Sequence, residues 1–103
     1  MIRSIVRPEC ADDVADALAA AGFIGMTRSS VVGRGRQQGI TSGTVRYDEL
    51  PKAMVMTVVE DDDVETVTAI VAKAAWTGHV GDGKIFVSPV EAAFTVRTGA
   101  TGL

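Results

Sequence analysis

The chain carries one pattern of hydrophobic periodicity twice, and this repeat limits the folds open to it more than any other feature. Residues 2–7 have the composition of a short strand, and from Ala11 apolar side chains recur at helical spacing before residues 25–33 return to an extended, β-branched pattern. The same order returns in the second half, with strands at 53–59 and 84–87 on either side of a helix that begins near Asp62. The repeat therefore predicts two strand–helix–strand units in one small domain.

Each predicted helix has one apolar stripe. The stripes are Val14, Ala17, Leu18 and Ala21 in the first helix, and Val64, Val67, Val71 and Ala74 in the second. Asp62 and Glu65 predict a capped start for the second helix, and Gly78 its end. Two such units predict an α+β, ferredoxin-like βαββαβ sandwich, an antiparallel sheet with two helices on one face. A further strand is expected at 93–97, and the bare face of the sheet predicts an oligomer.

Composition supports one folded domain over residues 1–103 and excludes several functions. Hydrophobic residues make up 47% of the chain, so disorder is not expected. A net charge of −3 argues against binding nucleic acid or an anionic membrane surface. One cysteine allows no internal disulfide, and no apolar run is long enough for a membrane span, so a cytoplasmic protein is expected. No serine or cysteine has an evident base partner, which indicates that the protein is not an enzyme.

Two glycine-rich segments are candidates for binding an anion. In residues 33–39, GRGRQQG, glycines expose backbone N–H groups and arginines suit phosphate. Residues 77–84, TGHVGDGK, nearly match the P-loop pattern, but Ile85 replaces the magnesium-binding hydroxyl and a strand is expected to follow. The alternative for residues 33–39 is a solvated, flexible turn, and for residues 77–84 an ordinary tight turn between helix and strand. Lys52 and Arg97 are isolated cations of a kind that is usually only solvated.

In order along the chain, these segments resemble the PII signal-transduction family, the GlnB/GlnK type. The resemblance covers essentially the whole chain and rests on the motifs IVRP at 5–8, GMT at 25–27, GRQQG at 35–39, LPK at 50–52, TGHVGDGKIFV at 77–87 and RTG at 97–99. It implies a trimer with clefts between subunits, in which ATP and ADP compete and 2-oxoglutarate joins MgATP. The long loop, at about residues 36–51, would be the T-loop, and residues of about 77–84 would form the B-loop.

The resemblance also implies the contacts of each ligand. The residues implied for the nucleotide are Thr27, Gly35, Arg36, Gln37, Val58, Gly81, Asp82, Gly83, Lys84 and Arg97. The residues implied for 2-oxoglutarate are Gln37, Gly39 and Lys52, and Gln37 would also help to hold Mg²⁺. The part of the loop implied to bind a partner protein is Gly39, Ile40, Thr41, Ser42, Gly43, Thr44, Val45, Arg46 and Tyr47.

Departures from the common pattern point to one branch of this family. The loop is short, Tyr47 lies too close to Pro51 to match the tyrosine modified in many members, and Thr95 stands where many members have an arginine. Together with YDELPK at 47–52, SPVE at 88–91 and the ending RTGATGL, these features resemble the nitrogen-fixation branch, the NifI type, and within it the first of two paired proteins.

That resemblance implies a regulator that inhibits the dinitrogenase component of nitrogenase when ammonia is plentiful. MgATP with 2-oxoglutarate would relieve the inhibition, and the chain would act as a homotrimer or together with its paired PII-like protein. Two alternatives stay open at this point. One is a general PII regulator of glutamine synthetase or of an ammonium transporter, which would bring it to a membrane. The other is a structural trimer of the same fold with no nucleotide role.

Overall fold

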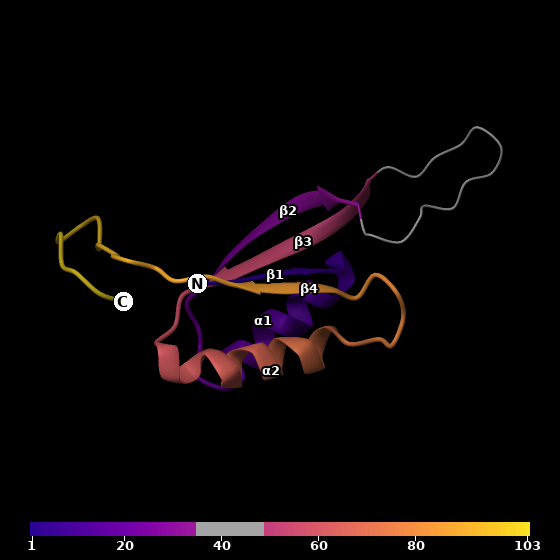
Figure 1. Cartoon of the computed structure of the whole chain (residues 1–103), viewed down its shortest axis with the longest axis horizontal. Coiled ribbons are helices and arrows are strands. Elements are labelled where there is room, and N and C mark those ends of the chain that lie inside the picture. The colour runs from indigo at the N-terminus through magenta and orange to yellow at the C-terminus, as the bar shows by residue number, and fades with distance from the viewer. Residues whose placement is uncertain (35–48) are drawn as a thin grey trace.

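A computed structural model describes residues 1–34 and 49–103 of the chain. Its elements are β1 (Ile2–Val6), α1 (Ala11–Ala20), β2 (Thr27–Gly33), β3 (Leu50–Thr57), α2 (Val64–Ala75) and β4 (Gly83–Val87), with short 3₁₀ helices at Pro8–Cys10 and Asp61–Asp63. Within these residues the strands form one antiparallel sheet in the order β2-β3-β1-β4. Both helices lie on one side of the sheet (Figure 1), which confirms the predicted ferredoxin-like α+β fold.

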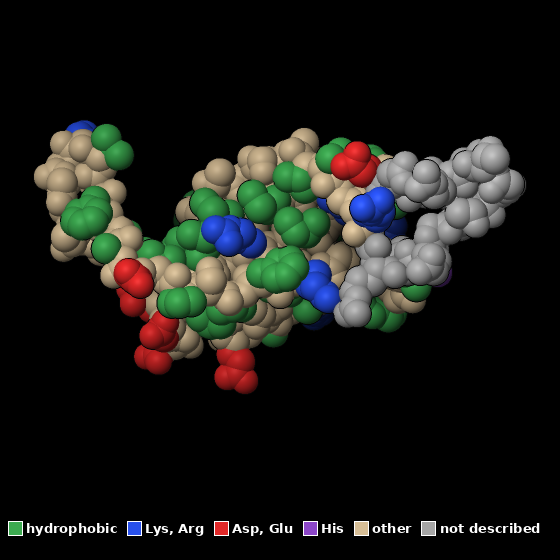
Figure 2. Space-filling model, turned by 45° about the horizontal axis from the view of Figure 1, so that its top comes forward, with side chains coloured by type: hydrophobic (Ala, Val, Ile, Leu, Met, Phe, Trp, Pro, Cys, Tyr) green, Lys and Arg blue, Asp and Glu red, His purple; other side chains and the backbone are tan. Residues whose placement is uncertain are grey.

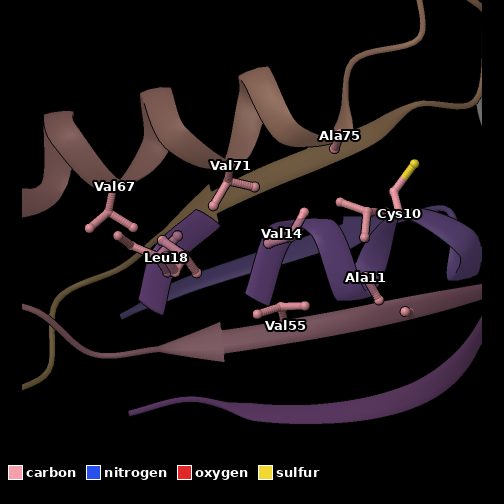
Figure 3. Close-up of a cluster of buried hydrophobic side chains, with 11 residues drawn as sticks. Cys10, Ala11, Val14, Leu18, Val55, Val67, Val71 and Ala75 are labelled. Carbon is pink, nitrogen blue, oxygen red and sulfur yellow. The ribbon is translucent and has the colours of Figure 1, made fainter. Parts of the chain in front are cut away.

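The core lies between the helices and one face of the sheet (Figure 3). Ile2, Ser4 and Val6 of β1 point into it, alternating with more exposed residues as the pleat of a strand requires. Of the predicted helical stripes, Val14 and Leu18 of α1 and Val67 and Val71 of α2 are buried. The prediction is wrong for Ala21, which is exposed because α1 ends at Ala20.

The predicted boundaries of the second helix and of β3 differ from the structure. The second helix was expected to end at Gly78, but α2 ends at Ala75 because the backbone is extended at Trp76. The second helix was expected to start with a cap from Asp62, but Asp62 lies in the 3₁₀ helix before α2 and no side chain caps either helix. The strand expected at 53–59 runs from Leu50 to Thr57. Leu50 and Pro51, predicted as the end of the long loop, instead pair with Gly33 and Val32 of β2, so the two-stranded ladder extends towards the loop.

Residues 93–97, expected to form a strand, lie in a folded arm. The N–H of Gly99 donates to the carbonyl of Thr95 (2.7 Å), and the N–H of Thr95 donates to that of Ala100 (2.8 Å). Gly99 has a φ of +71°, which turns the chain back on itself, so only the bridge between Phe94 and Thr101 has strand geometry. In Figure 1 the arm leaves the sheet beside the N-terminus.

The face of the sheet away from the helices is open in the single chain. Met54 and Met56 of β3 lie on it half-buried, and Phe86 of β4, which pairs with Arg3, is 52% exposed. Figure 2 shows hydrophobic side chains gathered over the sheet with Lys and Arg side chains among them. Met54 and Met56 lie two residues apart in β3 and therefore share this face of the sheet. Among the described residues, neither helix has the length and hydrophobicity of a membrane span.

Candidate anion-binding site

The turn between α2 and β4 is organised around one carboxylate. Asp82 accepts hydrogen bonds from the backbone N–H groups of Thr77 (2.7 Å) and Gly78 (3.0 Å). The hydroxyl of Thr77 donates to the same carboxylate and accepts from the N–H of His79 (3.2 Å). These bonds join the two ends of a six-residue loop, so the backbone of the turn is fixed by residues within it.

The hydrogen bonds around Asp82 favour its charged form. The hydrogen bond from the Thr77 hydroxyl lowers the pKa of Asp82 most, and that from the Thr77 backbone N–H comes next. The hydrogen bonds from Gly78 and Arg7 also lower it. Together they hold the pKa of Asp82 well below its usual range. The carboxylate is therefore ionised at every physiological pH, and its interactions within the turn do not depend on a proton.

Arg7 connects the turn to the end of β1. Its Nε donates to the Asp82 carboxylate (3.2 Å) and one terminal nitrogen donates to the carbonyl of Val80 (2.8 Å). Arg7 directly follows β1 and precedes Pro8, which begins a 3₁₀ helix, so the backbone on both sides of the guanidinium is fixed. Sequence reasoning assigned no ligand role to Arg7, although the IVRP motif contains it and marks the end of a strand.

Lys52 reaches the same turn from β3. Its Nζ donates to the carbonyl of Gly81 (2.6 Å), and its side chain is half-buried. Lys52 also lines a groove of about 620 Å³ together with Pro8, Val31 and Pro51. Two cations from separate strands, Lys52 and Arg7, therefore converge on neighbouring carbonyl groups of one turn. Because the Gly81 carbonyl is neutral, an anionic oxygen would be a stronger partner for Lys52, whereas Arg7 already pairs with the Asp82 carboxylate.

The glycines of the turn allow a close approach that other residues would prevent. A Cβ on Gly83 would lie 1.9 Å from the carbonyl oxygen of Ile5, and its φ is +118°. A Cβ on Gly81 would lie 3.1 Å from the Arg7 guanidinium, and its φ is +102°. Within the part of the chain that the structure describes, the backbone N–H groups of Val80 and Gly81 have no acceptor. The turn thus presents backbone donors beside Lys52 and Arg7, a combination suited to an anion.

The predicted nucleotide contacts fall into two groups within one chain. Gly81, Asp82 and Gly83 lie in or beside the turn, and Lys84 follows in β4 with an exposed side chain; Gly83 pairs with Val6, the last residue of β1. Thr27 and Val58 lie at the other end of the sheet, where Thr57 pairs with Ile2.

Four strand steps, about 13 Å, separate those two ends of β1. Arg97 belongs with the second group. It lies exposed in the folded arm, not in a strand as expected, and the arm leaves from the Ile2 end (Figure 1). Val58 lines a cleft of about 620 Å³ between the sheet and this arm. Within the described residues of one chain, the two groups therefore lie at opposite ends of the sheet.

Several predicted residues lie outside the described part of the chain. They are Gly35, Arg36, Gln37, Gly39 and the partner-binding segment Ile40, Thr41, Ser42, Gly43, Thr44, Val45, Arg46 and Tyr47. Among the described residues, no three Asp, Glu, His or Cys side chains come together as metal ligands. Mg²⁺ would therefore depend on phosphate oxygens of a nucleotide and on the predicted Gln37.

Trp76, which follows the last residue of α2, is 73% exposed and stands beside the turn. A Cβ on Gly78 would lie 3.1 Å from its ring, so the indole packs over the backbone of the turn. Trp76 is the sole tryptophan in the chain, and its fluorescence therefore reports on this site.

Comparisons with known proteins find one family model and several similar proteins. The family model described as Nitrogen regulatory protein P-II matches residues 1–100. The Nitrogen fixation nifHD region glnB-like protein 1 of Methanococcus maripaludis is 55% identical over 103 residues, covering 100% of this chain and 98% of that protein. The corresponding protein of Methanothermobacter marburgensis is 52% identical over the same coverage. The Nitrogen regulatory protein P-II 2 of Methanothermobacter thermautotrophicus is 49% identical over 105 residues, 98% of this chain and 91% of the relative.

Proposed function

This chain belongs to the nitrogen regulatory protein P-II family, in the branch of the nif-region GlnB-like proteins, and from that membership we propose that it senses nitrogen status without being an enzyme. It binds ATP or ADP and, together with MgATP, 2-oxoglutarate. It inhibits the dinitrogenase component of nitrogenase when ammonia is plentiful, and MgATP with 2-oxoglutarate relieves that inhibition. The names of its relatives, which place them in nitrogen-fixation regions, support nitrogenase as the target.

The observation that carries the sensor proposal is the contact between Lys52 and Gly81. Lys52 lies two residues into β3, close to where the chain emerges from the segment 35–48, and it already bonds to the candidate phosphate-binding turn. A dicarboxylate such as 2-oxoglutarate offers Lys52 a charged acceptor in place of a neutral carbonyl. The ligand would thereby act on the turn and on the base of the partner-binding segment together.

A trimer would complete the site. The two groups of predicted nucleotide contacts lie at opposite ends of the sheet, and Thr27 and Val58 of one chain would meet the turn of the next. The open sheet face, with Met54, Met56 and Phe86, provides apolar surface for such an assembly. The assembly is a homotrimer or includes a paired PII-like protein, and it works in the cytoplasm.

Release of the partner requires a difference in affinity. 2-Oxoglutarate shifts the balance only if it binds the released form better than the inhibitory form. A hundredfold preference would supply about 2.7 kcal/mol, enough to turn a mostly bound partner into a mostly free one. The segment 35–48 is the part of the chain whose arrangement would change, because it joins β2 to the strand that carries Lys52.

Titration calorimetry tests the sensor proposal. We expect the protein to bind MgATP, and to bind 2-oxoglutarate at least tenfold more tightly with MgATP present than without it. GTP in place of ATP is the control for base recognition by the Thr27 and Val58 end of the site. Absence of nucleotide binding would favour a structural trimer instead, and nucleotide binding with no response to 2-oxoglutarate would contradict the sensor role.

A further inference from the structure

The turn 77–82 is held in place by a side chain from a different strand. Of the contacts that fix it, those from Thr77, Gly78 and Asp82 are internal to the turn. Arg7 acts from the end of β1 at two points, and Lys52 acts from β3 at one, the Gly81 carbonyl. The guanidinium touches the turn at two separate points, the Val80 carbonyl and the Asp82 carboxylate. An internal network alone fixes the shape of a loop, and only an external contact fixes its place relative to the sheet.

The geometry of this contact requires arginine. One nitrogen, Nε, faces the carboxylate at 3.2 Å while another faces the carbonyl at 2.8 Å, so two donors in a rigid plane are used at once. The guanidinium also lies against the backbone of Gly81, where a Cβ would come within 3.1 Å. A lysine ammonium is a single point donor on a flexible stem, and it cannot span both acceptors while resting on this glycine.

We propose that Arg7 is a positioning residue that fixes the turn 77–82 against β1, so that the Val80 and Gly81 amides are held ready for an anion. Asp82 is then the internal brace of the turn. This inference rests on the proposed function for the identity of the anion, a nucleotide phosphate. The role of Arg7 in the free protein does not depend on the proposed function, because the turn is already formed there without a ligand.

A positioning role has a signature in the protein without any ligand. The amides of Thr77 and Gly78 donate to Asp82, and their hydrogen exchange depends on how often the turn opens. Replacing Arg7 by lysine removes the two-point contact and keeps the charge. We expect these two amides to exchange at least tenfold faster in Arg7→Lys than in the unchanged protein.

A second readout uses inorganic tripolyphosphate as the probe, measured by Trp76 fluorescence and calorimetry. It carries the phosphates without base or sugar, so it reports on the turn alone. We expect Arg7→Lys to lower its affinity at least fivefold. The matched control is Arg28→Lys. Arg28 lines the same groove as Lys52, but its guanidinium pairs with Asp12 (2.8 Å) and not with the turn, so this substitution should change neither readout.

Each outcome decides the role of Arg7. Faster hydrogen exchange together with weaker tripolyphosphate binding supports the positioning role. Unchanged hydrogen exchange overturns that role, whatever happens to the tripolyphosphate affinity. A residue that only contacted the ligand would change the affinity and leave the exchange unchanged. If Arg7→Lys does not fold, Arg7→Gln gives the same exchange test with an uncharged side chain. If the unchanged protein binds neither tripolyphosphate nor ATP, the proposed function fails while the exchange comparison still judges Arg7.

Discussion

Replacing Lys52 by methionine should weaken 2-oxoglutarate binding while leaving nucleotide binding nearly unchanged. Lys52 is half-buried, and its Nζ lies 2.6 Å from the Gly81 carbonyl oxygen. Methionine keeps most of the length and apolar character of the stem, so the substitution removes chiefly the charge and the donors. The fold should survive, because the strand carrying Lys52 is held by its pairing with both β1 and β2.

The expected loss of 2-oxoglutarate affinity follows from the change of hydrogen-bond partner at Lys52 Nζ, from the Gly81 carbonyl to a carboxylate of the ligand. A hydrogen bond to a charged group contributes about 1.5–3 kcal/mol. Lys52 already has a neutral acceptor in the free protein, and water reaches a half-buried side chain, so the lower part of this range applies. That part corresponds to a loss of about 10- to 30-fold in 2-oxoglutarate affinity.

Calorimetry with saturating MgATP measures this loss directly. The control is Lys73→Met, which removes an exposed lysine in the last turn of α2 and should change no affinity. Nucleotide affinity should change by less than about threefold in either variant, because Arg7 and Asp82 still hold the turn. Unchanged 2-oxoglutarate binding in Lys52→Met would refute the reasoning, and an equal loss for both ligands would assign Lys52 to the turn alone.

Three further predictions concern stability. Gly83→Ala should lower the free energy of unfolding in urea by about 3 kcal/mol or more, because the added Cβ would lie 1.9 Å from the Ile5 carbonyl oxygen. Gly25→Ala is the control: its Cβ would meet nothing within 4 Å, so the free energy of unfolding should hardly change. Thr57→Val should cost about 1–3 kcal/mol in the same assay, because the buried Thr57 hydroxyl donates to the Gly25 carbonyl at 2.7 Å; a loss below 0.5 kcal/mol, on the order of a surface change, would contradict this. Because the pKa of Asp82 is lowered on folding, its ionised form stabilises the protein above the unfolded pKa of about 3.9, and this stabilisation is lost as pH falls below that value. Thermal melts should therefore show a loss of stability below about pH 4 that Asp82→Asn lacks, and parallel curves would count against the assignment.

The sequence predicted the layers of the fold because periodicity records which side of each element is buried. Val14 and Leu18 repeat at helical spacing and meet the core, and the alternation around Val55 matches the pleat of β3. It did not predict the arm correctly, because a β-branched run such as FTV at 94–96 favours extended backbone and the turn at Gly99 decides otherwise.

The glycines of the site could be predicted from the sequence, whereas the contacts between residues far apart in the chain could not. The GDG motif at 81–83 marks the turn, and the structure adds a reason for Gly83, which packs against the backbone of β1. The resemblance marks Arg7 only as a replacement for the usual lysine near the pocket, and its contacts were not predicted because its partners, Val80 and Asp82, lie more than 70 residues away. Contacts of that range depend on the register between β1 and β4, which no local pattern encodes.

The opposite positions of Thr27 and the turn explain why the single chain looks incomplete as a binding protein. Each chain carries one half of the predicted nucleotide site at each end of its sheet. Under the proposed function, assembly would be a condition for ligand binding and not only for stability. A monomeric variant should fold and yet lose nucleotide affinity.

The most direct test of the whole account is capture of the partner from nitrogen-fixing cells after an ammonia pulse, with this protein as bait. Elution with MgATP plus 2-oxoglutarate, compared with MgATP alone and with the Lys52→Met bait, identifies what the effector releases. We expect dinitrogenase subunits in the eluate from the unchanged protein, and we expect them to stay bound to the Lys52→Met bait. Recovery of a transporter or glutamine synthetase in their place, or release that ignores 2-oxoglutarate, would contradict the account.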